Sequence, residues 1–232
     1  MHKESLFENI SKGEKSQEFR YLSKKNLFEP FKEKKVLDLG CGNGVYTKLL
    51  TRLGIKPIAF DINRISLELA KNYVGKIDIN TCLGTGIDLP FENSTFDLVI
   101  CIETLSHIPR EDHSQAFKEI SRVIKRDGIL ITSVHNHTRF ALQRLVRMRK
   151  PLLTYKTPGL TVYPFTKTEF KKNLTQVGFA VENRFSFLNF YNSIHQRYPR
   201  FFRLLIMVED LLSKIPIIKH TSITILTKAV KT

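Results

Sequence analysis

The chain has few cysteines and no long apolar run. Its three cysteines, Cys41, Cys82 and Cys101, lie far apart and form no CxxC pair, so neither a disulfide framework nor a zinc cluster is expected. No apolar stretch approaches the roughly 18 residues that a membrane-spanning helix needs. Residues 1–16 are polar and do not resemble a secretory signal. We therefore expect a protein of the reducing cytoplasm that has no metal site.

Acidic residues are scarce in the C-terminal part of the chain. Residues 131–232 contain 17 Lys and Arg against four Asp and Glu, whereas residues 1–130 contain 20 against 18. Nearly all of the net charge of +15 therefore comes from the last 102 residues. Such an asymmetry favours an anionic partner, which would be a nucleic acid, an acidic membrane surface or a phosphorylated substrate. A solvated surface of scattered lysines is the simple alternative.

The composition, with 42% hydrophobic and 25% charged residues, is that of a folded globular domain. Short apolar runs alternate with helical patterns over residues 35–134. Strands that are covered on both faces are apolar throughout, so this pattern predicts a doubly wound α/β fold with a mostly parallel sheet. We expect strands at 35–39, 58–60, 77–83, 96–102 and 128–134, and helices at 43–53, 65–73 and 114–124.

The alternation of strands and helices stops after Val134. The pattern then predicts helices at 167–176 and 199–212 and strands at 179–187 and 222–230. The very apolar helix at 199–212 is either a core helix or a wall for a lipid-like acceptor or membrane. We predict one domain over 1–232, with a helical cap (1–34), a cofactor-binding core (35–134), a basic insertion (135–165) and a part that completes the sheet (166–232).

The strongest motif is a strand that runs into three glycines, VLDLGCGNG at residues 36–44. Glycines adopt positive φ and let a ligand approach the backbone, and the helix that follows offers free N–H groups. The spacing is GxGxG, because Val45 stands where a nicotinamide site has its third glycine. Asp61 ends the next strand, where a carboxylate can accept the hydroxyls of a ribose. Its alternative role is to cap the following helix, for which Asn63 competes.

These motifs resemble those of the class I S-adenosylmethionine-dependent methyltransferases. The resemblance covers residues 35–134 in order and with family spacing, through VLDLGCGNG, AFDIN, GTGIDLPF, STFDLV, ETLSHI and SRVIKRDG. It implies a seven-stranded, mostly parallel, Rossmann-like sheet whose last strand is antiparallel. It also implies S-adenosyl-L-methionine as the cofactor.

The resemblance assigns roles to particular residues. Asp38 and the glycine loop would hold the methionine end of the cofactor, Asp61 the ribose, and Ile62 the face of the adenine. At position 85 relatives usually carry an Asp that binds the adenine amino group; this chain has Thr85, so recognition is weaker there or Asp88 assists. Cys101 would line the sulfonium pocket, unless it is a small buried filler. The expected cofactor-binding residues are Asp38, Gly40, Cys41, Gly42, Gly44, Asp61, Ile62, Thr85, Gly86, Ile87 and Cys101.

The candidate catalytic residues are histidines. Methyl transfer is an in-line displacement that depends mainly on alignment, and a base is needed only for a hydroxyl or an acidic carbon. His107 follows the fourth strand, and His135 and His137 follow the fifth. Each titrates near neutrality and can serve as the base; a structural role in its loop is the alternative.

The acceptor is less well defined than the cofactor. The leading interpretation is a small or lipid-linked molecule, such as a quinone precursor or a glycan intermediate, methylated on oxygen or carbon. A transfer-RNA methyltransferase and a cofactor-binding adaptor without catalysis are the alternatives. Peripheral contact with an anionic membrane is favoured over RNA because no RNA-binding module is evident. The basic residues concerned are Arg139, Arg144, Arg147, Arg149 and Lys150.

Overall fold

The computed structural model describes residues 19, 22–23, 27–75, 77–137, 155–157, 160–187, 211 and 224–232. Most of the expected N-terminal cap, much of the basic insertion and nearly all of the apolar helix expected at 199–212 lie outside these residues. Within the described part of the chain, no helix has the length and apolar character needed to cross a bilayer.

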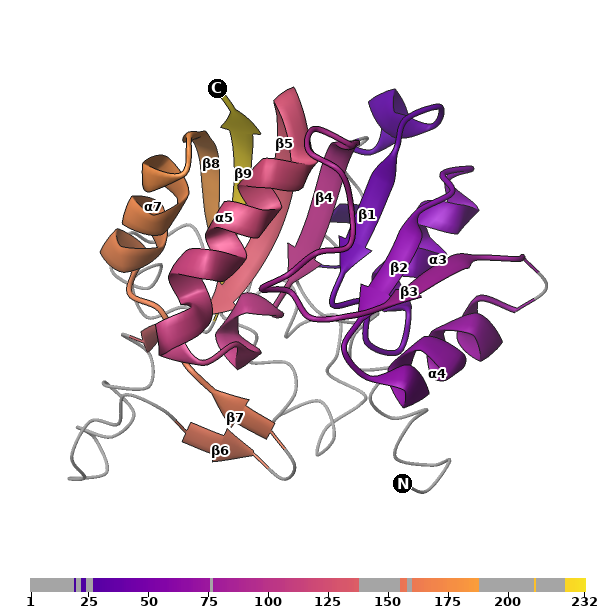
Figure 1. Ribbon diagram of the computed structural model, residues 1–232, viewed down its shortest axis with the longest axis horizontal. Helices are drawn as coiled ribbons and strands as arrows, with labels where there is room; N and C mark the ends of the chain where they lie inside the picture. The colour runs from indigo at the N-terminus through magenta and orange to yellow at the C-terminus, as the bar shows by residue number, and fades with distance from the viewer. Residues whose placement is uncertain are drawn as a thin grey trace.

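A seven-stranded sheet forms the centre of the molecule, in the order β3-β2-β1-β4-β5-β9-β8 (Figure 1). The strands from β3 to β5 pair in parallel, whereas β9 runs antiparallel to both β5 and β8. The doubly wound fold with an inserted antiparallel last strand is thus confirmed. The strands are β1 (Val36–Leu39), β2 (Ile58–Asp61), β3 (Asn80–Leu83), β4 (Phe96–Ile102), β5 (Ile124–His135), β8 (Phe179–Phe187) and β9 (Thr224–Lys231).

Helices cover both faces of this sheet because its central strands are apolar on both sides. In β4, Phe96, Val99 and Cys101 join a core with α5 and α7, while Leu98 and Ile100 join a second core with α3. Figure 1 shows α5 and α7 in front of the sheet. The helices are α3 (Val45–Arg52), α4 (Arg64–Val74), α5 (His113–Val123) and α7 (Lys167–Gln176), with short 3-10 helices η1 (Glu29–Phe31), η2 (Leu105–His107) and η3 (Arg110–Asp112).

Within residues 35–134, three boundaries differ from the sequence-based expectation by two residues or more. Strand β3 begins at Asn80 rather than at 77, because its pairing with β2 begins with Asn80 opposite Ile58. Strand β5 begins at 124 rather than at 128, since it pairs with β4 across a register shift. Helix α3 begins at 45 rather than at 43, because Gly44 precedes it with a left-handed φ of 82°.

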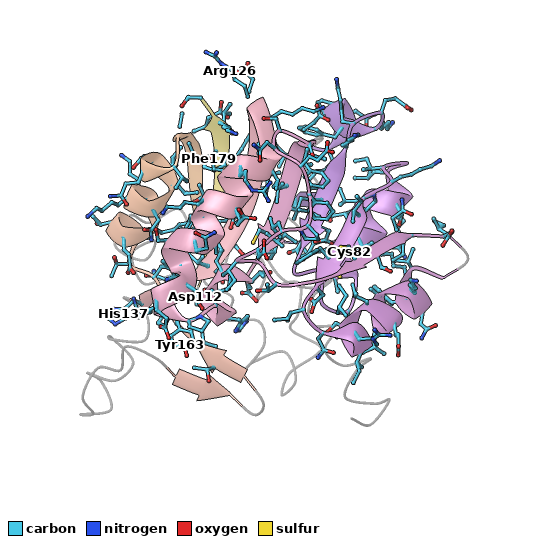
Figure 2. All side chains as sticks on the ribbon, viewed as in Figure 1. Cys82, Asp112, Arg126, His137, Tyr163 and Phe179 are labelled. Carbon is cyan, nitrogen blue, oxygen red and sulfur yellow. The ribbon has the colours of Figure 1, made fainter. Side chains whose placement is uncertain are left out.

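A small hairpin was not expected from the sequence. Strands β6 (Tyr155–Thr157) and β7 (Leu160–Val162) form a separate antiparallel pair. Next to β7, the Tyr163 N–H donates to the Ser106 carbonyl in η2 at 2.7 Å. The hairpin therefore lies against the end of the sheet where β1, β4 and β5 end. Figure 2 shows Tyr163, His137 and Asp112 at this end and Arg126 at the opposite one.

Candidate functional site

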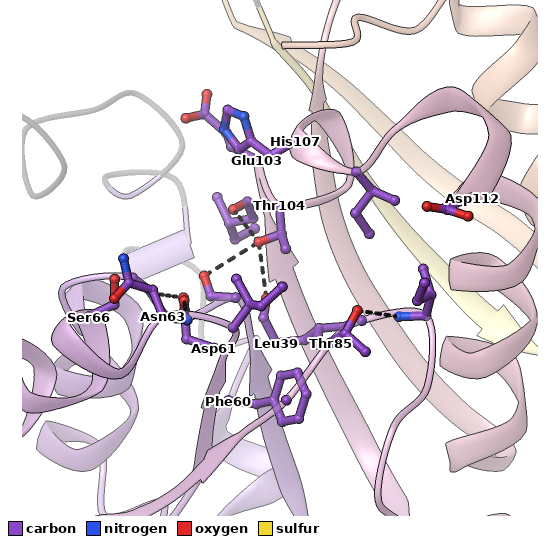
Figure 3. A pocket seen from close by; sticks show the side chains of 18 of the residues that line it. Leu39, Phe60, Asp61, Asn63, Ser66, Thr85, Glu103, Thr104, His107 and Asp112 are labelled. Atoms are coloured by element: carbon purple, nitrogen blue, oxygen red, sulfur yellow. Dashed lines mark hydrogen bonds between the residues drawn. The ribbon is translucent and has the colours of Figure 1, made fainter. Parts of the chain in front are cut away.

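Four loops converge at the carboxyl ends of β1, β2, β3 and β4, beside the point between β1 and β4 where the chain order of the strands reverses. Ligands of open α/β sheets bind at such a point. The loops enclose a cavity of about 600 Å³, a size typical of small-molecule sites (Figure 3). Its walls are formed by Leu39, Gly40, Gly42, Phe60, Asp61, Ile62, Asn63, Ser66, Gly84, Thr85, Gly86, Ile87, Ile102, Glu103, Thr104, His107, Ile108, Pro109 and Asp112.

The glycine loop forms one wall of the cavity. Gly40, Gly42 and Gly44 all adopt positive φ angles, between 52° and 82°. A side chain at Gly40 would collide with Thr104, and one at Gly44 would come within 2.8 Å of Ala70. Beside Gly42, by contrast, the space is open to at least 4 Å. Gly40 and Gly44 are therefore needed for packing, and Gly42 is the position at which a ligand can approach the backbone.

Asp61 lies beside this loop and points into the cavity. Its Oδ2 accepts the Gly42 N–H at 2.9 Å, and its Oδ1 accepts the Asn63 N–H at 2.8 Å. The helix cap is Asn63, whose side chain accepts the Ile65 N–H at 2.9 Å. Asp61 is thus free of the capping role, and each of its oxygens retains a lone pair for a ligand hydroxyl. Next to it, Ile62 is 74% exposed, which leaves an apolar face for a flat ring.

Asp38 lies behind the glycine loop rather than in the cavity wall. Its carboxyl is 2% exposed and accepts the Thr47 hydroxyl at 2.5 Å. Burial raises the pKa of Asp38 to about 7, against the Thr47 hydrogen bond, and the nearby charge of Asp61 raises it further. Asp38 therefore does not line the cavity, and its hydrogen bond with Thr47 joins β1 to α3 behind the glycine loop.

Replacing Asp38 by Asn is expected to stabilise the protein at alkaline pH. Because the folded-state pKa is raised, the stability is greatest at low pH and is lost as the pH rises from about 4 to about 7. An Asn keeps the Thr47 hydrogen bond and never ionises. We expect the advantage of Asp38→Asn over the parent in free energy of unfolding to be larger at pH 8 than at pH 5, by on the order of a few kcal/mol, measured by urea unfolding. An equal difference at both pH values would contradict the burial-raised pKa.

The turn after β3 forms the opposite wall. Thr85, Gly86 and Ile87 line the cavity, as the resemblance implies. The Thr85 hydroxyl accepts the Ile87 N–H at a long 3.5 Å. Asp88 pairs with Thr85 in an isolated bridge but does not line the cavity. The expectation that Asp88 assists in adenine binding is therefore not supported by its position.

Glu103 and Thr104 follow β4 and form the upper end of the cavity in Figure 3. The Thr104 hydroxyl lies within 3.1 Å of the Leu39 carbonyl and so ties this loop to the glycine loop. Glu103 has a left-handed φ of 57°, which is uncommon for a non-glycine residue and costs of order 1–3 kcal/mol. Its N–H is held by the Ser133 carbonyl at 3.0 Å. Glu103 was not expected at the site from the sequence, although its position directly after a parallel strand indicates the edge of the sheet at which ligands bind.

His107 is the histidine that lines the cavity. Its Nδ1 lies 3.2 Å from the Thr161 carbonyl in β7. Since a carbonyl can only accept, the neutral ring carries its proton on Nδ1 and its lone pair on Nε2. Burial lowers the pKa of His107, the Thr161 hydrogen bond opposes this, and the neighbouring His135 lowers it further. His107 is therefore a neutral base at neutral pH.

His135 and His137 do not line the cavity. The ring of His135 lies 5.9 Å from that of His107, centroid to centroid, and its Nε2 is 3.8 Å from Glu103 Oε1. The backbone N–H of His137 donates to the Phe165 carbonyl at 2.8 Å, which ties the end of β5 to the chain after the hairpin. Of the three candidate bases, the structure places only His107 at the cavity.

Two of the cysteines expected at the site are buried away from it. Cys41 packs with Ala59 and Ala70 in a small core, and Cys101 is fully buried in the main core. Neither lines the cavity. Burial raises the pKa of Cys101 to about 12, so its thiol stays neutral. For Cys101 the structure corrects the expectation of a cofactor contact and favours the buried filler.

The charge of the cavity wall is negative. Asp61, Glu103 and Asp112 line it, and no Lys or Arg does so among the described residues. Opposite charges attract most strongly where water is excluded. The cavity therefore suits a ligand that carries positive charge, a polar sugar and a flat apolar ring. In the part of the chain that the structure describes, no three metal-ligating side chains come together.

Comparison with known proteins agrees with this geometry. Residues 37–132 match the family model of a methyltransferase domain. An uncharacterized protein of Methanocaldococcus jannaschii is 35% identical over 116 residues, which are 47% of this chain and 46% of that protein. The ubiquinone biosynthesis O-methyltransferase of Schizosaccharomyces pombe is 30% identical over 118 residues, 48% of this chain and 41% of that one. The chain thus spans about half or less of the length of these two relatives.

Solved structures share the fold over most of the chain. A protein of Pyrococcus horikoshii superposes with a TM-score of 0.62 at 23% identity, covering 94% of this chain and 92% of that one. An S-adenosylmethionine dependent methyltransferase of Mesorhizobium loti does so with 0.60 at 14% identity, covering 85% and 91%. At these identities the likeness concerns the fold, and it extends beyond the residues that match the family model.

Proposed function

We propose that this chain, whose residues 37–132 match the family model of a methyltransferase domain, is a class I S-adenosylmethionine-dependent methyltransferase. It methylates a hydroxyl or an acidic carbon of a small or lipid-linked acceptor. The observation that carries the proposal is that one cavity joins the glycine loop and Asp61 to a neutral base, His107. A site for the cofactor alone would not need a base.

The described residues fit S-adenosyl-L-methionine. The open space beside Gly42 would accommodate its methionine part, Asp61 would accept the ribose hydroxyls and the exposed Ile62 would pack on the adenine. The negative wall attracts its ammonium and sulfonium charges. When bound, the cofactor supplies an electrophilic methyl group on a positively charged sulfur.

His107 takes the proton of the acceptor. Its Nδ1 is held by Thr161, so Nε2 is the ring nitrogen that accepts the proton as the acceptor oxygen or carbon becomes nucleophilic. The charge of Glu103 favours the protonated form of His107 and stabilises the ring once it has taken the proton. The Thr104 hydroxyl bonds the Leu39 carbonyl, so the loop after β4 and the glycine loop keep fixed positions relative to one another.

A small acceptor is favoured by the size and charge of the cavity. Its volume of about 600 Å³ leaves limited room beside a cofactor of nucleoside size, and its carboxylates repel phosphate groups. The name of the Schizosaccharomyces pombe relative, an O-methyltransferase of ubiquinone biosynthesis, supports a hydroxyl acceptor on a lipid-linked ring. A transfer-RNA acceptor would bring an anionic polymer against this negatively charged wall, which is unfavourable.

A methyl-transfer assay tests the proposal. The purified protein is incubated with methyl-labelled S-adenosylmethionine and a set of phenols and catechols with and without a prenyl chain. Transfer to at least one hydroxylated ring, lost in His107→Ala, supports the proposal. Cofactor binding without transfer to any acceptor, RNA included, would instead favour the adaptor.

The basic C-terminal part is expected to bind an anionic membrane. Arg144, Arg147 and Arg149 lie outside the described residues, so this prediction depends on charge alone. We expect the protein to sediment with vesicles of anionic lipid and not with neutral ones, at about 1 kcal/mol for each basic residue near the surface. Replacing the three arginines together by Gln should weaken sedimentation and leave cofactor affinity unchanged.

A parallel experiment with transfer RNA separates the alternatives. Binding to RNA would fall log-linearly with salt because each neutralised phosphate releases counterions. Strong binding to transfer RNA near physiological salt, with none to vesicles, would overturn the membrane proposal. Binding to neither would leave the positive charge as a solvated surface and favour a water-soluble acceptor.

A further inference from the structure

Asp112 lines the cavity, and the function proposed so far uses it only as one of the three negative charges of the wall. It is the last residue of η3 and occupies the N-cap position of α5. An Asp at this position commonly accepts a backbone N–H from the first turn of the helix. The Asp112 side chain makes no such bond and contributes to the cavity wall instead.

The surroundings of Asp112 leave its charge directed at the cavity. The neighbouring Arg110 is turned to α7 and the loop before it, where it bonds Glu169 at 3.0 Å and the Pro164 carbonyl at 2.8 Å. Arg110 therefore does not neutralise Asp112 by a salt bridge. Within the described residues no hydrogen bond or ion pair engages the Asp112 carboxylate, which is half-buried.

The loop that carries Asp112 is held against the wall formed by residues 85–87. A Cβ on Gly86 would lie 3.5 Å from Ile108 Cδ1, so the two loops approach each other closely. The His113 side chain fixes Ile108 through its carbonyl at 2.9 Å. Glu119 of α5 accepts the Leu89 N–H at 2.8 Å. Helix α5 thus fixes both loops, and Figure 3 shows Asp112 on the side of the cavity away from Asn63 and Ser66.

The resemblance to class I methyltransferases implies an acid at position 85 that binds the adenine amino group, and this chain has an uncharged Thr85 there. We propose that Asp112, from the facing loop, binds the adenine amino group in place of that acid and sets the preference of the site for adenine. The inference rests on the proposed function, because it assigns one contact of the cofactor.

A hydrogen bond to a charged acceptor of this kind changes affinity by about tenfold to a hundredfold. A purine with an oxygen in place of the amino group would present an acceptor to the carboxylate and be repelled. Asp112 would therefore distinguish adenine from a purine that lacks the amino group, and it would do so by hydrogen bonding and not by a general attraction of cations.

The test compares two ligands, S-adenosylhomocysteine and S-inosylhomocysteine, by calorimetry. The parent protein should prefer the adenine ligand by about tenfold or more. Asp112→Asn keeps the shape of the side chain but should weaken binding of the adenine ligand by at least about tenfold and abolish the preference. Adding Thr85→Asp to this variant should restore both.

Glu111→Gln is the matched control. Glu111 is the exposed neighbour in η3 and does not line the cavity, so the change removes the same charge and should leave both affinities unaltered. If the parent binds S-adenosylhomocysteine and Asp112→Asn keeps the full preference for it, the inference is overturned while the proposed function stands. If the parent binds neither ligand, the proposed function itself fails.

Discussion

Replacing His107 by Ala is expected to lower kcat by about 10²- to 10⁴-fold with an acceptor that must lose a proton. The reason is geometric: His107 is the histidine at the cavity, and Thr161 fixes its lone pair on Nε2. The affinity for S-adenosylmethionine, measured by calorimetry, should change little, because the glycine loop and Asp61 remain. Steady-state methyl transfer to the true acceptor measures the effect.

His137→Ala is the control, because this residue follows the same sheet edge but lies outside the cavity wall. The pH profile provides a second check. Because burial lowers the pKa of His107, kcat should be level above about pH 6.5 and fall only at lower pH, where the base becomes protonated. Full turnover in His107→Ala would show that the acceptor needs no protein base, and an amine or thiolate acceptor would then replace the hydroxyl.

Replacing Asp61 by Ala is expected to weaken S-adenosylmethionine binding at least tenfold. The change removes two charge-assisted hydrogen bonds to the ribose, each of which contributes about 1.5–3 kcal/mol. It also frees the N–H groups of Gly42 and Asn63, which the carboxylate holds at 2.9 and 2.8 Å. Calorimetric titration with the cofactor measures the loss.

Glu68→Gln is the matched control for the lost charge, since Glu68 is exposed on α4 and does not line the cavity. Asp61→Asn separates the contribution of the hydrogen bonds from that of the charge, because an amide oxygen still accepts one N–H but carries no charge. An Asp61→Ala protein that is folded and binds the cofactor with parent affinity would refute the ribose contact.

The sequence alone determined the fold and the position of the glycine loop and Asp61 at one edge of the sheet. Strand β4 and helix α7 have the bounds that were expected, 96–102 and 167–176, because burial on two faces or on one stripe leaves a periodic signal in neighbouring residues. The glycine loop and Asp61 were also recognised, since both lie at the carboxyl end of a strand and their residue types fit a nucleotide. In each case the information lies within a few consecutive residues.

The tertiary structure alone decided which side chains reach the cavity. His107, His135 and His137 looked equivalent in the sequence, and the choice of His107 depends on Thr161, 54 residues away along the chain. The tertiary structure also decided the surroundings of Cys101 and Asp112. Cys101 is fully buried in the core, whereas the Asp112 side chain makes no N-cap hydrogen bond and lines the cavity. Local periodicity indicates that a residue is buried, but it does not show which residues it packs against. The residues that contact it come from segments that are distant along the chain, so a short window of sequence does not contain them.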